Sequence, residues 1–215
     1  MERTCNSTYS PCDFVMKARD NQPASLTLGL FSSLLSDMNV RFLTDKVREH
    51  GNDAQAHKLL LPAICWQAKF RGKLRTNANA IPTGLFCIDV DIHHEARFRE
   101  LLAAGGRAAA IAWATAEAHG RATRWTAMQE QEDCGNASHG ELGIVAIHIS
   151  PSGTGVHVVA VCHEDCRSIP ENQQRLAHLL GTSYDEACSD WARIFFVAPR
   201  PDWYYIDYDT LFPEH

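Results

Sequence analysis

Two aspartates separated by a single residue, Asp89 and Asp91, are the side chains of this sequence best suited to metal chemistry. They interrupt an apolar run at residues 85–92 that predicts a strand, and side chains two positions apart in a strand point to the same face. Two carboxylates in apolar surroundings repel each other, and a divalent cation between them relieves that repulsion. Hard oxygen ligands with room for phosphate suit Mg²⁺ or Mn²⁺. Taken alone, the pair has a simpler alternative, in which one aspartate caps the following helix.

The second feature is a turn rich in serine and glycine at residues 150–155, Ser-Pro-Ser-Gly-Thr-Gly, followed by His157. It joins two apolar runs, 143–149 and 156–161, so two strands connected by a sharp turn are expected. Glycines let backbone N–H groups approach an anion, and serine hydroxyls add donors. A lone histidine on such a strand is usually a core residue. Beside the aspartate pair, however, we expect phosphate binding by Ser150, Ser152, Gly153, Gly155 and His157.

Basic residues occupy every second position in one stretch: Lys69, Arg71, Lys73 and Arg75. In an extended segment this spacing puts the four cations on one face. Two interpretations stay open. The strip is either a solvated surface or a weak nucleic-acid-binding surface that attracts phosphate beside the acidic site.

Several other residues have simpler explanations. His93 and His94 directly follow Asp91 and could be metal ligands, although the start of a helix is the favoured interpretation. His148 lies in an apolar run and is expected in the core. Four aromatic residues near the chain end could stack on bases, but we expect them to close a core: Trp203, Tyr204, Tyr205 and Tyr208.

The elements that position these residues form an α+β pattern, with short strands of mixed direction and helices packed on them. A short extended piece at 13–17 precedes two helices, one starting near 23–25 and one capped at 36–37 that ends near 51. Residues 117–141 are polar and are read as a helix plus an inserted loop. An amphipathic helix at 170–180 and a strand at 193–197 complete the pattern.

Composition excludes several classes of protein. With 215 residues, 45% hydrophobic and 21% charged, the chain is typical of globular proteins and unlike disordered, collagen-like or coiled-coil chains. The low-polarity run at 101–118 is broken by Gly105, Gly106 and Arg107, so a half-buried helix is expected and not a membrane span. Cys162, His163 and Cys166 could bind zinc, but no second pair accompanies them among eight cysteines. Reduced thiols in a cytoplasmic protein are therefore expected.

The motifs occur in the order of a known family. Residues 84–91 resemble the hydrophobic strand with Asp-x-Asp of the archaeo-eukaryotic primase superfamily, and 150–157 resemble its Ser-x-His motif. Residues 184–196 are similar to the third motif, with Asp185 eight positions before Arg193. The closest resemblance is to the virulence-protein E N-terminal group of primase-polymerase domains, through Lys-Leu-Leu-Leu-Pro-Ala at 58–63 and the serine-glycine turn. The matched pieces span about residues 58–205. Departures from the group are a long gap between Asp91 and Ser150 and a net charge of −6.

The resemblance implies a primase-polymerase fold with an RRM-like core, a mixed or antiparallel sheet flanked by helices. Residues 1–57 would be an N-terminal helical part packed on a catalytic core, 58–215, with an insertion at about 115–142, as one structural domain overall. Asp89, Asp91 and Asp185 would hold two Mg²⁺ or Mn²⁺ ions, Asp190 being the substitute for the third carboxylate. Arg193 would contact the phosphates or Asp185.

The implied reaction is template-dependent transfer of nucleotides from nucleoside triphosphates to a 3′ hydroxyl, with release of pyrophosphate. Implied partners are a single-stranded DNA or RNA template and a helicase domain or protein, in replication of mobile elements or in defence, and no membrane. Two alternatives stay open. One is a metal-dependent nuclease or phosphohydrolase that uses Asp89, Asp91, His93, His94 and His157. The other is a non-catalytic nucleic-acid-binding relic of the primase fold.

Overall fold

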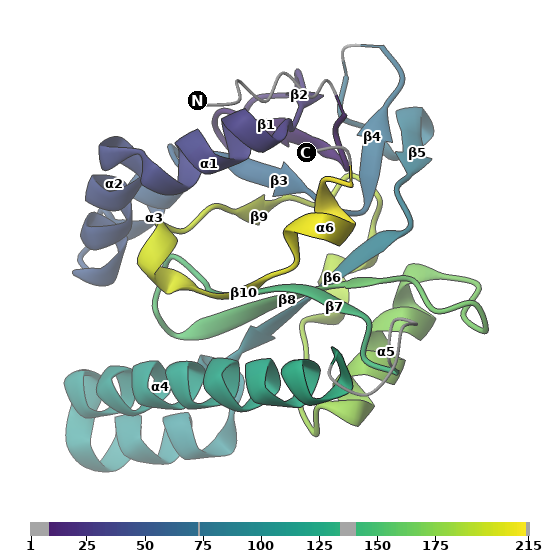
Figure 1. The fold of residues 1–215 in the computed structure, drawn as a ribbon. Coiled ribbons are helices and arrows are strands. Elements are labelled where there is room, and N and C mark those ends of the chain that lie inside the picture. Colours follow the sequence, from purple (N-terminus) through teal and green to yellow (C-terminus); the bar gives the residue numbers. More distant parts are fainter. Residues whose placement is uncertain (1–8, 73, 134–140, 214–215) are drawn as a thin grey trace, which may run out of the picture. The chain divides into compact units, whose positions relative to one another are not determined.

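A computed structural model describes residues 9–72, 74–133 and 141–213 and has the expected α+β architecture (Figure 1). The chain divides into two compact units. The first contains the described residues up to Leu85, together with Asp190–Pro201 and those from Asp207 onward; the second contains Phe86–Ser189 and Asp202–Ile206. Each unit therefore combines segments that are far apart in the sequence. The single-domain organisation expected from the sequence stays a prediction.

The strands of the first unit form a four-stranded sheet of order β2-β1-β3-β9 with antiparallel neighbours, and a separate antiparallel pair, β4 and β5. The four-stranded sheet consists of β1 (Asp13–Val15), β2 (Ala24–Ser25), β3 (Ala63–Cys65) and β9 (Phe195–Phe196). The pair consists of β4 (Ala68–Phe70) and β5 (Ala80–Pro82). The extended piece expected at 13–17 is present as β1 over its first three residues, and the strand expected at 193–197 is reduced to β9.

The first two helices of the first unit begin at polar caps. The Thr27 hydroxyl accepts from the amide of Leu30 and the Asp37 carboxylate from that of Asn39, so each satisfies an N–H without an intrahelical partner. The helices are α1 (Leu28–Ser36), α2 (Met38–Arg48), α3 (Ala54–Lys58) and α6 (Tyr208–Leu211), with short turns η1 (Asn77–Asn79) and η4 (Arg200–Asp202). The cap expected at 36–37 is confirmed. The first helix begins later than expected because residues 24–25 pair with β1.

The second unit is built on a sheet of order β10-β7-β8-β6. Its strands are β6 (Leu85–Asp91), β7 (Ile144–Ile149), β8 (Gly155–Val161) and β10 (Trp203–Ile206). β7 pairs antiparallel with both β8 and β10. The amide of Ile92, just past β6, donates to the carbonyl of Thr154, just before β8, at 3.2 Å. The end of β6 therefore lies beside the turn that joins β7 to β8.

Helix α4 (Ala96–Asp133) packs on β7, β8 and β10. Its backbone is non-helical at Gly106 (φ 77°, ψ 177°), so it consists of two helical stretches that meet there (Figure 1). Four fully buried alanines, spaced by four, line one face of the second stretch, and their small size permits close approach to the sheet: Ala110, Ala114, Ala118 and Ala122. The unit also contains η2 (Ile92–His94), α5 (Ile169–Leu179) and η3 (Glu186–Ser189).

Two expectations concern this region. Residues 117–133 belong to α4, so the helix expected in this stretch is present; the expected inserted loop falls largely on 134–140, outside the described residues. The low-polarity run at 101–118 is half-buried only in its second part, because residues 102–109 are exposed. In the described part of the chain, no helix combines the length and hydrophobicity that a membrane crossing requires.

Candidate metal and phosphate site

Asp89 and Asp91 lie at the end of β6 and point to the same face of the sheet, as the sequence predicts. Burial alternates along the strand: the two aspartates are partly exposed, with side chains 22% and 26% accessible, and Val90 between them is buried. Both carboxylates therefore lie where ions and phosphate could reach them, at the end of β6 that faces the serine-glycine turn.

That turn is held by its own backbone and hydroxyl groups. The amide of Ser150 donates to the carbonyl of Gly155, and the amide of Gly153 donates to the carbonyl of Ser150, both at 2.9 Å. Gly153 has a φ of 77°, a conformation that favours glycine. The Ser152 hydroxyl lies 2.9 Å from the Ser150 hydroxyl and 3.1 Å from the Thr154 hydroxyl. The turn thus gathers three hydroxyl groups over five residues.

Gly155 shows how closely the turn approaches the aspartates. A Cβ atom at this position would lie 3.0 Å from the carbonyl oxygen of Val90, 3.1 Å from the Ser150 hydroxyl and 3.3 Å from Asp91 Oδ1. The hydroxyl of the turn and the carboxylate of β6 therefore flank the same α-carbon. Only glycine fits this packing without displacing one of them.

Gly155→Ala is accordingly expected to destabilise the protein by about 1–3 kcal/mol, because the added methyl group meets backbone as well as side chains. Urea denaturation followed by circular dichroism measures the change. The matched control is Gly29→Ala in α1, where a Cβ meets no atom within 4 Å, and where alanine should stabilise the helix by about 0.5–1 kcal/mol. Equal stability changes in the two variants would show that the turn is not packed as described.

His157 links the turn side of the sheet to Asp89. Its Nε2 lies 3.5 Å from Asp89 Oδ1, and its Nδ1 lies 3.3 Å from Nε2 of His148. Nδ1 of His148 lies 3.0 Å from the carbonyl oxygen of Ile149, which can only accept, so this nitrogen carries the proton. Nε2 of His148 is then an acceptor for the N–H of His157. These contacts fix the orientation of the His157 ring and present its Nε2 to Asp89.

His148 is the residue that sequence reasoning assigned only to the core. It is indeed buried, and burial, together with the neighbouring His157, holds the pKa of its imidazole well below the usual value. It also stacks on Trp203, with ring centroids 4.1 Å apart and an interplanar angle of 18°. The sequence carried a signal for its contact with His157. Ser150 and Gly155 close the turn, His148 lies two positions before Ser150, and His157 lies two positions after Gly155, so the two histidines are cross-strand partners.

Asp185 lies beside Asp89 through its backbone, since its amide donates to the Asp89 carbonyl at 2.8 Å. Its carboxylate, however, accepts from the amide of Ala187 at 2.9 Å and contacts the Cys188 thiol at 3.5 Å. Among the described residues, the three predicted ligands do not form a cluster with ligand atoms within 4.8 Å of one another. The structure therefore brings the backbone of Asp185 next to that of Asp89. The Asp185 side chain, however, is held by contacts within its own loop.

An Asp/His cluster that could hold a metal ion does occur at the end of β6. One ligand atom from each of Asp91, His93 and His94 lies within 4.8 Å of the other two. Both histidines belong to η2, the short turn before α4, so the helix-start interpretation describes their backbone and leaves their imidazoles available.

The remaining candidates belong to the first unit. The guanidinium of Arg193 contacts Asp190 at 3.1 Å, so these two residues form an ion pair there. The basic strip is not one extended face, because β4 ends at Phe70 and Gly72 turns the chain with a φ of 76°. Arg75 donates to the carbonyls of Ala192 and Ala18, and the Lys69 ammonium lies over the Tyr9 ring; Arg71 is exposed, and Lys73 lies outside the described residues.

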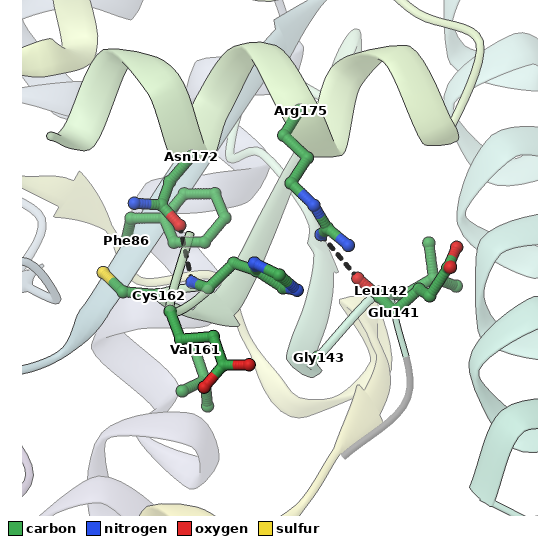
Figure 2. Close-up of a pocket in the computed structure, with 10 residues that line it drawn as sticks. Phe86, Glu141, Leu142, Gly143, Val161, Cys162, Asn172 and Arg175 are labelled. Carbon is green, nitrogen blue, oxygen red and sulfur yellow. Dashed lines mark hydrogen bonds between the residues drawn. The ribbon is translucent and has the colours of Figure 1, made fainter. Parts of the chain in front are cut away.

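The second unit also contains a hollow of about 260 Å³ (Figure 2). Its lining includes Phe86 at the start of β6 and Val161 at the end of β8, so it lies at the strand ends opposite to Asp91 and Gly155. Arg175 donates to the Glu141 carbonyl at 2.6 Å, and Asn172 accepts from the amide of His163 at 2.7 Å. The hollow contains Cys162 and His163 of the zinc alternative, but the described residues form no metal-like cluster there. All six described cysteines are free, as expected for reduced thiols.

Comparisons with known proteins add no assignment to this geometry: no protein-family model matches the chain, and no curated protein or solved structure is significantly similar to it.

Proposed function

We propose that this chain is a primase-polymerase, a template-dependent nucleotidyltransferase that joins nucleoside triphosphates to a 3′ hydroxyl and releases pyrophosphate. One observation carries the proposal. The serine-glycine turn packs against Asp91 at Gly155, while His157, two residues further along β8, points Nε2 at Asp89. Two carboxylates of β6, His157 of β8 and the hydroxyls of the turn thus lie at one end of the sheet, an arrangement that supports phosphoryl transfer. The antiparallel sheet with α4 is the part that we assign to the RRM-like core.

The chemistry of the donor set fits divalent cations. Asp89 and Asp91 supply hard oxygen atoms on one face, which suits Mg²⁺ or Mn²⁺, and the backbone of Asp185 is hydrogen-bonded to that of Asp89. Bound ions would lower the pKa of the attacking hydroxyl and neutralise the leaving pyrophosphate. The hydroxyls of Ser150 and Ser152 would orient the triphosphate, and His157, when protonated on both ring nitrogens, would donate to it from Nε2.

A synthesis assay tests the proposal directly. The protein is incubated with a single-stranded template, with and without a primer, nucleoside triphosphates and Mg²⁺ or Mn²⁺, and the products are separated by size. Strand extension with pyrophosphate release is the expected result, and its loss in Asp91→Ala and His157→Ala is expected as well. Unchanged product from both variants would remove the assigned site. Template binding without synthesis under any of these conditions would favour the non-catalytic relic.

The hydrolytic alternative is favoured by a specific observation, the cluster of Asp91 with His93 and His94. Imidazole ligands are common in metal-dependent nucleases and phosphohydrolases, because a nitrogen-bound transition ion activates water. The same assay separates the two functions. Shortening of the template or release of inorganic phosphate without strand extension would support hydrolysis.

His148 is expected to act on nucleotide binding through His157. In His148→Phe, the ring still stacks on Trp203 but offers no acceptor to His157 Nδ1, so the His157 ring loses its orientation. We expect the KM for nucleoside triphosphate to rise about tenfold, with a smaller change in kcat. His148→Gln restores an acceptor and should recover part of the loss. A purely structural role would lower the melting temperature in both variants and give no such recovery.

A further inference from the structure

We propose that Asp91, His93 and His94 form a binding site for one divalent transition-metal ion of the Co²⁺ and Zn²⁺ class. The proposal goes beyond the transferase assignment and does not depend on it. The Asp89–Asp91 pair offers only oxygen atoms and suits Mg²⁺, whereas this cluster offers two imidazole nitrogens and one carboxylate. Nitrogen donors select later first-row ions over Mg²⁺, which prefers oxygen and gives up its water reluctantly.

The distances require little rearrangement. One ligand atom of each residue lies within 4.8 Å of the others, and His93 Nδ1 is 3.7 Å from Asp91 Oδ1. Ligand atoms bound at the usual zinc–nitrogen length are about 3.4 Å apart in a tetrahedral site. Rotations about side-chain bonds of His93 and His94 can close this difference without movement of the backbone.

The local backbone holds the three ligands together at small entropic cost. They fall within four consecutive positions, at the end of β6 and in η2, so no long loop has to be closed. The two imidazole rings already lie edge to face, with centroids 4.2 Å apart. Directly after them, the Glu95 carboxylate is bound by Arg121 at 2.7 Å, and Arg121 is anchored further by Glu117. These ion pairs fix the chain that leaves the cluster and keep the Glu95 carboxylate engaged elsewhere.

The ligands are also accessible. The His93 side chain is 41% exposed, Asp91 is partly exposed and His94 is exposed. An ion can therefore reach the cluster from solvent and retain water at its open positions. Asp91 is common to this cluster and to the aspartate pair, so an ion of the Zn²⁺ class held by the histidines would engage a carboxylate that the pair also needs.

Cobalt titration of the full chain tests the site, because Co²⁺ bound by nitrogen and oxygen ligands absorbs visible light more strongly than hexaaqua Co²⁺ does. We expect one equivalent of Co²⁺ to bind and Zn²⁺ to displace it, while millimolar Mg²⁺ does not. His93→Gln and His94→Gln should each weaken binding at least tenfold. Equal Co²⁺ binding by the wild type and both variants, or no binding by the wild type, would overturn the proposal.

Two further variants locate the ion. His163→Gln removes the histidine between Cys162 and Cys166 and should leave Co²⁺ binding unchanged; loss of binding in this variant, with thiolate-to-cobalt absorption in the wild type, would move the site there and refute the proposal. Asp89→Asn separates this proposal from the transferase assignment, since it removes a ligand of the aspartate pair and none of the cluster. If the wild type makes no product but still binds Co²⁺ through His93 and His94, the transferase assignment fails and the metal site stands.

Discussion

Asp89→Asn is expected to lower the rate of nucleotide addition by about a thousandfold, measured by single-turnover primer extension in Mg²⁺ or Mn²⁺. Asparagine keeps the shape of the side chain but replaces a charged oxygen with a neutral amide, so the affinity for a divalent cation and the stabilisation of developing charge are both lost. The position also faces His157 Nε2 at 3.5 Å, and the neutral amide removes the negative charge opposite that ring nitrogen.

The matched control for this prediction is Asp165→Asn. Its carboxylate is 87% exposed and contacts His163 on the surface, so the same chemical change should leave synthesis within twofold of the wild type. Thermal melting of both variants shows whether the fold is intact. An Asp89→Asn protein that melts like the wild type and retains a tenth or more of its activity would show that Asp89 is not a ligand in the reaction.

The parts of the site that the sequence predicted are those determined by local rules. Alternation along a strand places Asp89 and Asp91 on one face whatever the tertiary structure does, and the structure has them so. Glycine at positions 153 and 155 indicated a sharp turn, and Gly153 adopts a left-handed conformation in that turn. The contact between the turn and Asp91 was expected from the combination of motifs alone, and its physical basis is the register that puts Thr154 beside Ile92.

What the sequence did not predict depends on which of several local interactions wins. The carboxylate of Asp185 can reach an ion or the amide two residues ahead, and in the structure it accepts from Ala187, as aspartate does in turns. The basic strip was read as extended because its charges alternate, but Gly72 ends the alternation two residues past β4. In both cases a short-range backbone preference overrides a pattern of charges.

The long helix α4 shows how a helix continues through polar sequence. Within the polar residues 117–141 the sequence predicts a helix and then an inserted loop, and the helix extends to Asp133. The buried alanines continue through Ala118 and Ala122 to Trp125, whose indole N–H donates to the carbonyl of Leu180 at 3.3 Å. Spacing by three and four residues indicates a helix even when the remaining positions are polar, because only the stripe that faces the sheet must be apolar.

Replacement of His157 should reduce kcat/KM for nucleoside triphosphate by about a hundredfold, mainly through KM, because a phosphate donor acts in the ground state as well as in the transition state. His157→Ala also leaves a cavity at a position only 3% exposed and removes the contact with His148, so its melting temperature should fall. His157→Gln keeps an N–H donor and much of the volume, and it should recover stability and part of the affinity.

His163→Ala, at the opposite strand ends, is the control for a histidine outside the site. In one outcome, kcat/KM follows the melting temperature across the series and His157→Gln matches the wild type in both quantities. His157 is then a core residue, and the phosphate assignment is wrong. If instead KM rises in His157→Gln while its stability is retained, the histidine acts on the nucleotide itself.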